Sequence, residues 1–281
     1  MFYNFGKPAK TIIYIILCVS LLLVLFPLVY AFLGSFKSTT EFLTGGTKLL
    51  PKEWIWQNYV TAWNVSNFGR YMLNSLVLSG SAILGTLVIC SLSGYVFART
   101  EFFGKKLLLA MLVGTMFVSG SVTLFPIFML SNRLGITNSV LGTALVLVAT
   151  GQQTYCFIIM GFVSNVPKEL DEAARLDGCG FFRIYWNVIL PIIKPILATV
   201  TILKLRDAWN AYMLPLAFTL GKPHLRPLTV GVVMLKEQGE GISSWNLMIA
   251  GTVMSLIPMI IIYIFMNKQF ISGVTDGSVK G

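Results

Sequence analysis

Six long apolar runs alternate with shorter polar segments along the chain. A membrane-spanning helix needs about 20 apolar residues to cross about 30 Å of hydrocarbon, and each run reaches that length. The pattern predicts an all-α integral membrane protein with six transmembrane helices and both termini on one side. The predicted spans cover residues 11–33, 72–97, 107–130, 139–163, 190–218 and 247–266. Pro195 and Pro215 are expected to interrupt the fifth span.

Residues 164–195, called the charged hairpin below, form the one long charged interval between two apolar runs. Pro167 suits the first position of a helix, because its missing N–H needs no partner there. Gly178 suits the position just after a helix, where glycine ends it. A second short helix is expected over residues 181–189, with one apolar side made by Phe182, Tyr185, Trp186 and Ile189. Periodicity leaves two interpretations open: a loop resting on lipid headgroups, or a surface that binds another protein.

Composition agrees with a membrane location. Apolar residues make up 56% of the 281 residues and charged residues only 11%, whereas soluble domains carry about 25% charged residues. The net charge is +10, but the basic residues are scattered among loops. This distribution suits anchoring at lipid headgroups better than binding of nucleic acid. The four cysteines show no paired spacing, so neither a disulfide framework nor a metal site is predicted.

The sequence lacks the motifs of the common catalytic classes. No G-x-x-x-x-G-K-[ST] motif is present, so the chain cannot hold ATP phosphates as a P-loop does. G-x-S-x-G and H-E-x-x-H are absent as well, and the single histidine, His224, lies in a predicted outer loop. We therefore predict no catalytic residues, no enzyme activity and no cofactor in this chain.

The charged hairpin carries a spaced motif. Glu172-Ala173-Ala174 is followed after three residues by Gly178, and Val188-Ile189-Leu190-Pro191 follows nine residues later. This stretch resembles the EAA signature of the permease subunits of ABC importers, EAA-x3-G-x9-I-x-LP, with Val188 in place of isoleucine. The chain also resembles maltose-type carbohydrate importers at residues 74–75, 94–99 and 208–210. Its last nine residues, 273–281, are similar to the sugar-permease terminus G-x-T-x-G-x-V-K-G.

The resemblance implies a type I ABC importer permease, one transmembrane subunit of an ATP-driven oligosaccharide importer. Its implied partners are a second permease, two ATP-binding subunits that hold ATP and Mg, and an extracytoplasmic sugar-binding protein. The residues implied to couple to the ATPases are Glu172, Ala173, Ala174, Gly178, Leu190, Pro191 and Lys280. The alternative class is a secondary transporter that works without ATP; inverted repeats would favour it, and the sequence shows none.

The resemblance also implies a domain organisation and an orientation. The expected parts are an N-terminal helix with an extracytoplasmic segment (1–70), an importer core (71–266) and a cytoplasmic tail (267–281). Ten Lys and Arg residues on one side against eight on the other give only a weak bias. Because the family places the EAA loop in the cytoplasm, both termini are expected there, in a bacterial inner or cell membrane.

The fifth span contains charged residues where such permeases are usually apolar. Lys204, Arg206, Asp207 and Asn210 share an arc of about 160° on a helical wheel, with Trp209 and Tyr212 opposite. Ionisable groups inside a membrane usually face a cavity or a partner. The candidates for the substrate pathway are therefore Lys204, Arg206, Asp207, Trp209, Asn210 and Tyr212.

Two interpretations of these charges remain open. If Lys204 pairs with Asp207 three residues later, Arg206 is left unmatched within the chain. Its guanidinium could then grip a carboxylate of an acidic oligosaccharide such as a uronate. The rival interpretation is that an acidic residue of the partner permease pairs with Arg206 and that the cargo is neutral.

Overall fold

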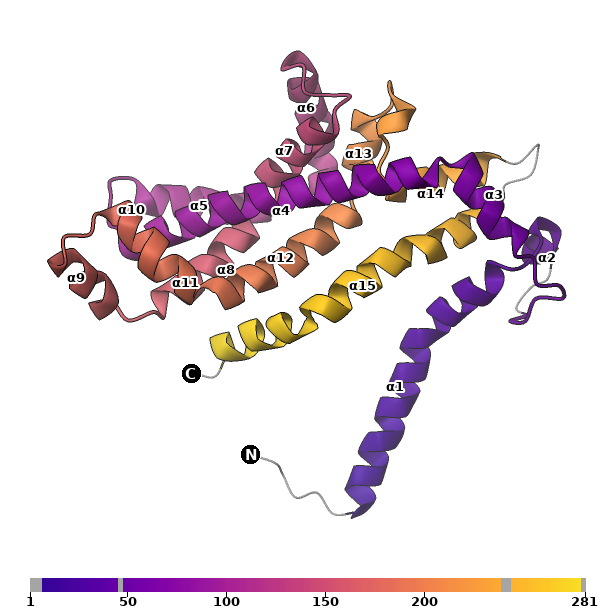
Figure 1. Ribbon diagram of the computed structural model, residues 1–281, viewed down its shortest axis with the longest axis horizontal. Helices are drawn as coiled ribbons and strands as arrows, with labels where there is room; N and C mark the ends of the chain where they lie inside the picture. The colour runs from indigo at the N-terminus through magenta and orange to yellow at the C-terminus, as the bar shows by residue number, and fades with distance from the viewer. Residues whose placement is uncertain (1–6, 45–47, 239–243, 279–281) are drawn as a thin grey trace. The chain divides into compact units, whose positions relative to one another are not determined.

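The computed structural model describes residues 7–44, 48–238 and 244–278, and among these the side chains of 9–44, 48–237 and 244–265. All regular structure in these ranges is helical (Figure 1). The predicted all-α fold is confirmed.

The chain divides into two compact units, the first made of Met1–Phe68 and Gly231–Ile257 and the second of Gly69–Val230 and Pro258–Gly281. The first unit contains α1 (Lys7–Gly34), α2 (Thr39–Thr44), α3 (Gln57–Val65) and the 3₁₀ turn η3 (Leu235–Gln238). The second contains α5 (Lys105–Met116), α6 (Gly120–Arg133), α7 (Val140–Thr150), α8 (Gln152–Ser164), α9 (Glu169–Leu176), α10 (Phe181–Ile184), the π-turn η1 (Tyr185–Ile189), α11 (Leu190–Ile192), α12 (Lys194–Trp209), α13 (Met213–Phe218) and the 3₁₀ turn η2 (Pro223–Leu225). Three helices contain a boundary between the units: α4 (Phe68–Arg99), α14 (Leu228–Met234) and α15 (Trp245–Ser278).

The predicted spans are of two kinds in the structure. Three are continuous apolar helices, over Ala9–Gly34, Phe68–Arg99 and Trp245–Phe265. The other three are bent pairs: the third and fourth spans were expected to be single helices, whereas the fifth was expected to be interrupted. The α5–α6 pair bends by 109°, the α7–α8 pair by 55°, and Phe181–Ile192 meets Lys194–Trp209 at 76°. Within the described residues, up to six spans result if each bent pair is counted as one.

Local chemistry explains where the breaks fall. Ser119 precedes α6 in an extended conformation, and its Oγ accepts a hydrogen bond from the Ser121 N–H at 3.4 Å. Gly151 separates α7 from α8. Pro195 follows the break at Ile193, where its ring and missing N–H oppose a continuous helix. The interruption expected at Pro215 lies instead at residues 210–212, since Pro215 fits the first turn of α13.

The first unit is held by one aromatic side chain and one amide. The Phe36 ring is buried and lies 4.9 Å, 4.7 Å and 5.3 Å, centroid to centroid, from the rings of Trp54, Trp56 and Tyr59. Asn58 donates to the carbonyls of Ser35 and Lys37, at 2.8 and 2.9 Å, and accepts from Asn246 at 3.0 Å. These bonds join the end of α1, the start of α3 and the start of α15.

The second unit has its core between α4, α8, α12 and the charged hairpin. Tyr95, Ile159, Ile184, Ile189 and Val200 are fully or almost fully buried in one cluster. At the far side of this unit, α13 packs against both α6 and α7, and the three project to the same side of α4 (Figure 1).

Close approach of α4 to α8 depends on Gly94. A Cβ at this position would lie 2.9 Å from Ile159 Cγ2 and 3.1 Å from the Met160 backbone nitrogen. Gly80 lies on the same helix with open space around its Cα. Alanine at Gly80 therefore changes helix propensity alone, whereas alanine at Gly94 also changes the packing of α4 on α8.

We predict opposite effects for alanine at these two positions. Gly80→Ala should stabilise the protein by up to about 1 kcal/mol, because alanine is the better helix former. Gly94→Ala should lower stability by about 1–3 kcal/mol through overpacking. Thermal unfolding of the purified protein in detergent measures both, and equal midpoints for the two variants would contradict the packing of α4 on α8.

Candidate functional site

The first limb of the charged hairpin is an eight-residue helix, α9, that ends in a glycine turn. Gly178 has φ +79°, its N–H donates to the Arg175 carbonyl, and the Cys179 N–H donates to the Ala174 carbonyl, each at 3.0 Å. This pair of bonds is the Schellman motif. The predicted stop at Gly178 is confirmed. The predicted start is wrong: α9 begins at Glu169, two residues after Pro167.

The second limb begins at Phe181 as expected, but a π-turn, η1, follows its first α-helical turn. Tyr185 and Ile189 are buried, together with Ile184. Phe182 and Trp186 were expected on the same apolar side but are 73% and 66% exposed. The buried side of this segment therefore contains Ile184 in place of Phe182 and Trp186. Phe182 and Trp186 instead line an open apolar groove of about 440 Å³ beside α4.

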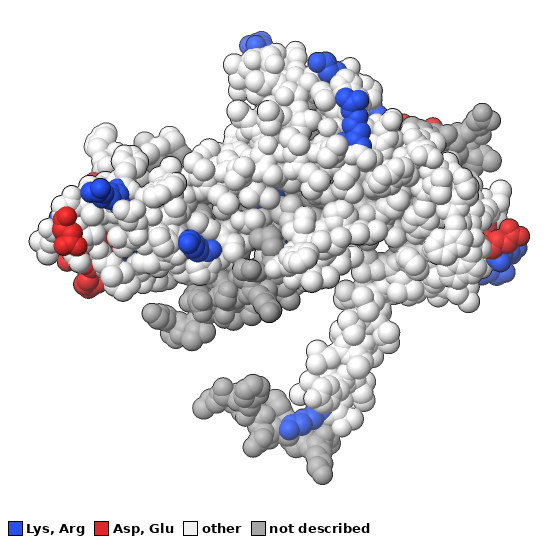
Figure 2. Space-filling model, viewed as in Figure 1, with Lys and Arg blue, Asp and Glu red and all other residues white. Residues whose placement is uncertain are grey.

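The residues implied to couple to the ATPases divide into an exposed and a packed group. Glu172, Ala173, Gly178 and Pro191 are exposed, whereas Ala174 is buried and Leu190 partly buried. Figure 2 shows acidic side chains gathered over the part of the second unit that α9 forms. The motif thus supplies both a surface and the packing beneath it. Lys280 lies outside the described residues.

Sequence reasoning missed the ion pair that holds α9. Arg99, at the end of α4, places its Nε 3.0 Å from Asp171 Oδ2, and the two side chains are only 3% and 6% exposed. Arg99 Nη2 also donates to the Val166 carbonyl at 2.8 Å. Neither residue was predicted to have a partner within the chain. The one available signal was that Arg99 closes the stretch 94–99, which resembles the family.

The charges of α12 do not lie as the helical wheel predicted. Lys204 is 3% exposed and donates to the Leu147 carbonyl, in the last turn of α7, at 2.7 Å. Its Nζ lies 5.5 Å from the centroid of the Tyr155 ring. The expected Lys204–Asp207 pair is absent among the described residues. Lys204 therefore stabilises the carbonyl end of α7, where the helix dipole favours a cation.

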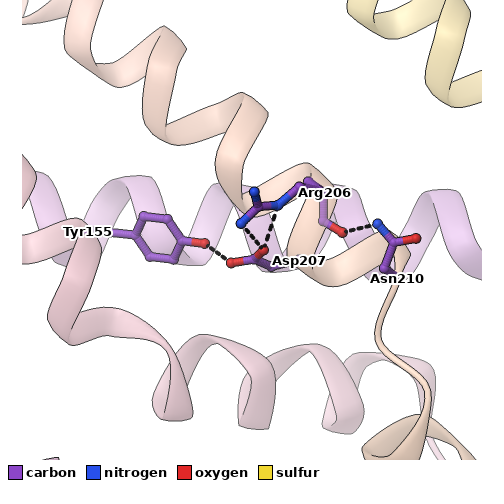
Figure 3. Close-up of polar contacts among 4 residues, drawn as sticks. All are labelled: Tyr155, Arg206, Asp207 and Asn210. Atoms are coloured by element: carbon purple, nitrogen blue, oxygen red, sulfur yellow. Dashed lines mark hydrogen bonds and ion pairs between the residues drawn. The ribbon is translucent and has the colours of Figure 1, made fainter. Parts of the chain in front are cut away.

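Asp207 pairs with its neighbour instead. Arg206 Nη2 lies 3.0 Å from Asp207 Oδ1, and Tyr155 Oη donates to Asp207 Oδ2 at 2.5 Å (Figure 3). The expectation that Arg206 is unmatched within the chain is wrong. The Arg206 and Asp207 side chains are 63% and 48% exposed, so this pair faces outward from the described chain although it lies within a predicted span.

The three remaining pathway candidates lie at or beyond the end of α12. Trp209 is buried, and its carbonyl accepts from Thr229 Oγ1 at 2.6 Å. Asn210 is exposed and donates to the Arg206 carbonyl at 2.9 Å (Figure 3). Tyr212 is partly buried. Because the helix ends at Trp209, the helical wheel does not apply to Asn210 and Tyr212.

The helical fold with its three bent pairs of helices and an exposed, motif-bearing hairpin is that of a membrane permease. Residues 5–274 match the family model of the binding-protein-dependent transport system inner membrane component. The chain belongs to this family, and it is a permease subunit rather than an enzyme.

Individual relatives agree with the family. The chain is 32% identical over 279 residues to a putative ABC transporter permease protein, ORF2, of Caldicellulosiruptor sp. (strain Rt8B.4), covering 99% of this chain and 100% of that one. It is 29% identical over 234 residues to the melibiose/raffinose/stachyose import permease protein MelC of Bacillus subtilis (strain 168), covering 83% and 84%.

The fold is similar to that of a solved transporter. A chain from the crystal structure of a bacterial ABC transporter involved in the import of the acidic polysaccharide alginate superposes with a TM-score of 0.79. The match covers 96% of this chain and 99% of that chain, at 22% sequence identity. The predicted type I importer permease fold is confirmed.

The turn at Gly178 generates a matched pair of predictions. Gly178 has open space around its Cα, so any penalty for a side chain comes from its positive φ alone. Gly180 also has open space, but its φ is −75°. Gly178→Val should disorder the hairpin, because a β-branched residue at positive φ is strongly disfavoured, and Gly180→Val should not.

Trypsin cleavage in membranes measures this difference at the exposed Arg175 and Arg183. We expect faster cleavage in Gly178→Val and an unchanged rate in Gly180→Val. Equal rates for both variants would show that the turn does not depend on the backbone conformation of Gly178.

Proposed function

We propose that this chain is one transmembrane subunit of an ATP-driven carbohydrate importer and that the charged hairpin binds a cytoplasmic ATPase subunit. The observation that carries the proposal is the geometry of the EAA motif. Glu172 and Ala173 are exposed on a short helix. Ala174 packs the buried side of that helix, and the hydrogen-bonded turn at Gly178 ends it. The family membership and the relatives named for ABC transport and sugar import support it.

The proposed complex contains a second permease, two ATP-binding subunits and an extracytoplasmic sugar-binding protein. ATP and Mg bind the partner ATPases. When these close on ATP, the charged hairpin moves with them and the spans shift between inward-facing and outward-facing states. Such a mechanism is a two-state equilibrium biased by a ligand at a distant site.

The orientation and the division of the chain belong to the same proposal. If the hairpin binds a cytoplasmic subunit, an even number of crossings places both termini in the cytoplasm of a bacterial cell. Residues 1–70 then form an N-terminal helix and an extracytoplasmic segment, 71–266 the importer core, and 267–281 a tail whose Lys280 contacts the ATPases. The ATP-independent secondary transporter remains the alternative class.

The cargo is proposed to be an oligosaccharide, and its charge depends on the Arg206–Asp207 pair. Asp207 already serves as an in-chain counterion for Arg206, and Tyr155 fixes Asp207 from the other side. An acidic sugar would therefore have to displace Asp207 from an exposed guanidinium. MelC is named for neutral sugars and the alginate transporter for an acidic one. We keep the acidic oligosaccharide as a proposal, with a neutral cargo as its rival.

The first test reverses the charge of Glu172. In Glu172→Lys we expect normal insertion but loss of bound ATPase, because a surface reversal leaves the apolar spans unchanged. The measurement is the amount of ATPase subunit, and its ATP hydrolysis, recovered with the tagged chain from membranes. Glu101→Lys makes the same charge change at another exposed acidic residue, on the connection between α4 and α5, and should behave as the native chain. Undiminished ATPase recovery with Glu172→Lys would refute the docking surface.

The second test separates acidic from neutral cargo at Arg206. In vesicles with the complete transporter, Arg206→Gln should lower uptake of a mannuronate trisaccharide about 10–100-fold, the effect of losing a charged hydrogen bond of about 1.5–3 kcal/mol. Uptake of raffinose, the neutral probe, should not change.

Asp207→Asn is the matched variant for this test. It removes the competing carboxylate and should raise uptake of the mannuronate trisaccharide. Equal losses for both sugars, no change for either, or transport of raffinose alone by the native complex would reject the acidic cargo.

A further inference from the structure

The helix that carries Glu172 has little apolar attachment of its own. Only two of the eight residues of α9 are buried, Asp171 and Ala174. A helix of this length is not stable by itself in water, and one alanine buries too little surface to fix its direction. The position of α9 therefore depends on Asp171 and on the partners of its carboxylate, which are Arg99 at 3.0 Å and, more weakly, the Tyr95 hydroxyl at 3.5 Å.

The Arg99 side chain fixes both the start and the direction of α9. Its Nη2 donates to the Val166 carbonyl, just before the helix, and its Nε lies 3.0 Å from Asp171 Oδ2 in the first turn, an ion pair without hydrogen-bond geometry. One guanidinium thus contacts the chain at two points, before α9 and in its first turn. Burial makes the pair hard to open, because separating it leaves an unpaired charge out of water.

A second contact joins α4 to the other limb of the hairpin. Ser91 Oγ lies 2.7 Å from Tyr185 Oη, and both residues are buried. Between the two contacts, the Tyr95 ring lies 4.8 Å from the Phe181 ring and 5.4 Å from the Tyr185 ring, centroid to centroid. Residues 91–99 of α4 thus bind both limbs of the charged hairpin over about two turns.

The opposite end of α4 is also bound. Asn74 Nδ2 donates to the carbonyls of His224 and Arg226 at 2.9 and 3.0 Å, and the Leu228 N–H donates to Ser75 Oγ at 2.7 Å. From residue 74 to residue 99 an unbroken α-helix extends about 37 Å, enough to cross the hydrocarbon. Most of the other spans of this unit are bent pairs, so α4 is suited to carry a displacement across the membrane.

We propose that the Arg99–Asp171 ion pair makes the charged hairpin and the end of α4 one rigid body, so that movement of the ATPases is transmitted to α4. The proposal rests on the proposed function, because it takes the hairpin as the ATPase contact. Arg99 and Asp171 are positioning residues: they act through α9 and α4 and do not contact the ATPase themselves.

The test compares the movement of α4 in the assembled transporter with and without the pair. Single cysteines replace exposed α4 residues in a chain whose own four cysteines are replaced, and alkylation by N-ethylmaleimide is timed. The positions are Leu73, Leu76, Val77, Leu84 and Val88. Each complex is measured without nucleotide and with Mg-ATP and vanadate.

We expect alkylation at some of these positions to depend on nucleotide in the reference complex. In Asp171→Asn this dependence should fall about tenfold, while ATPase recovery and ATP hydrolysis are retained. Arg99→Lys keeps the charge but not the two-point contact and should be intermediate. Glu101→Gln opens the exposed Lys105–Glu101 pair of the adjacent connection and should change nothing.

The outcomes separate this inference from the proposed function. A nucleotide response that is equal in Asp171→Asn and the reference overturns the inference alone, as does a reference complex in which no α4 position responds. If neither Asp171→Asn nor Arg99→Lys assembles, the pair is a folding element and the inference fails. If no ATPase is recovered with the native chain, the proposed function itself fails.

Discussion

A membrane offers no water to hydrogen-bond the backbone, so each interruption of a spanning helix must be satisfied by the protein. This constraint governs the second unit, where three spans are bent pairs. At one break the buried Lys204 donates to the Leu147 carbonyl, and at another the Ser119 side chain accepts from the following helix. The breaks direct α6, α7 and α13 to the same side of α4 (Figure 1).

The same constraint explains which charges lie inside and which face outward. Lys204 is buried because a helix end provides an acceptor for it. Arg206 and Asp207 remain half exposed because they neutralise each other. An exposed ion pair inside a membrane protein needs a water-filled path or a second subunit beside it. This surface is therefore the one that the proposed function assigns to a partner permease or a cargo.

In contrast to these bent helices, α4 is continuous through the second unit and is bound at both ends, to the charged hairpin and to the loop around residues 224–228. The exposed pair Lys105–Glu101 lies just beyond α4, and the hydrogen bond from Lys105 lowers the pKa of the Glu101 carboxyl. That pair is screened by water, whereas Arg99–Asp171 is not. The Lys105–Glu101 pair is thus a weak surface contact, whereas the Arg99–Asp171 pair nearby is a buried, structural one.

The sequence by itself determined the helical class, the position of six apolar runs and the hairpin, because apolar run length and the glycine at a helix end are local properties. It also placed the Gly178 turn correctly. Only the tertiary structure decided that three spans are bent, that Asp171 binds Arg99, and that Asp207 pairs with Arg206 rather than with Lys204. Asp171 and Arg99 lie far apart in the sequence, and the partners of Lys204 and Asp207 on other helices are Leu147 and Tyr155. A helical wheel cannot show which neighbouring helix supplies such a partner.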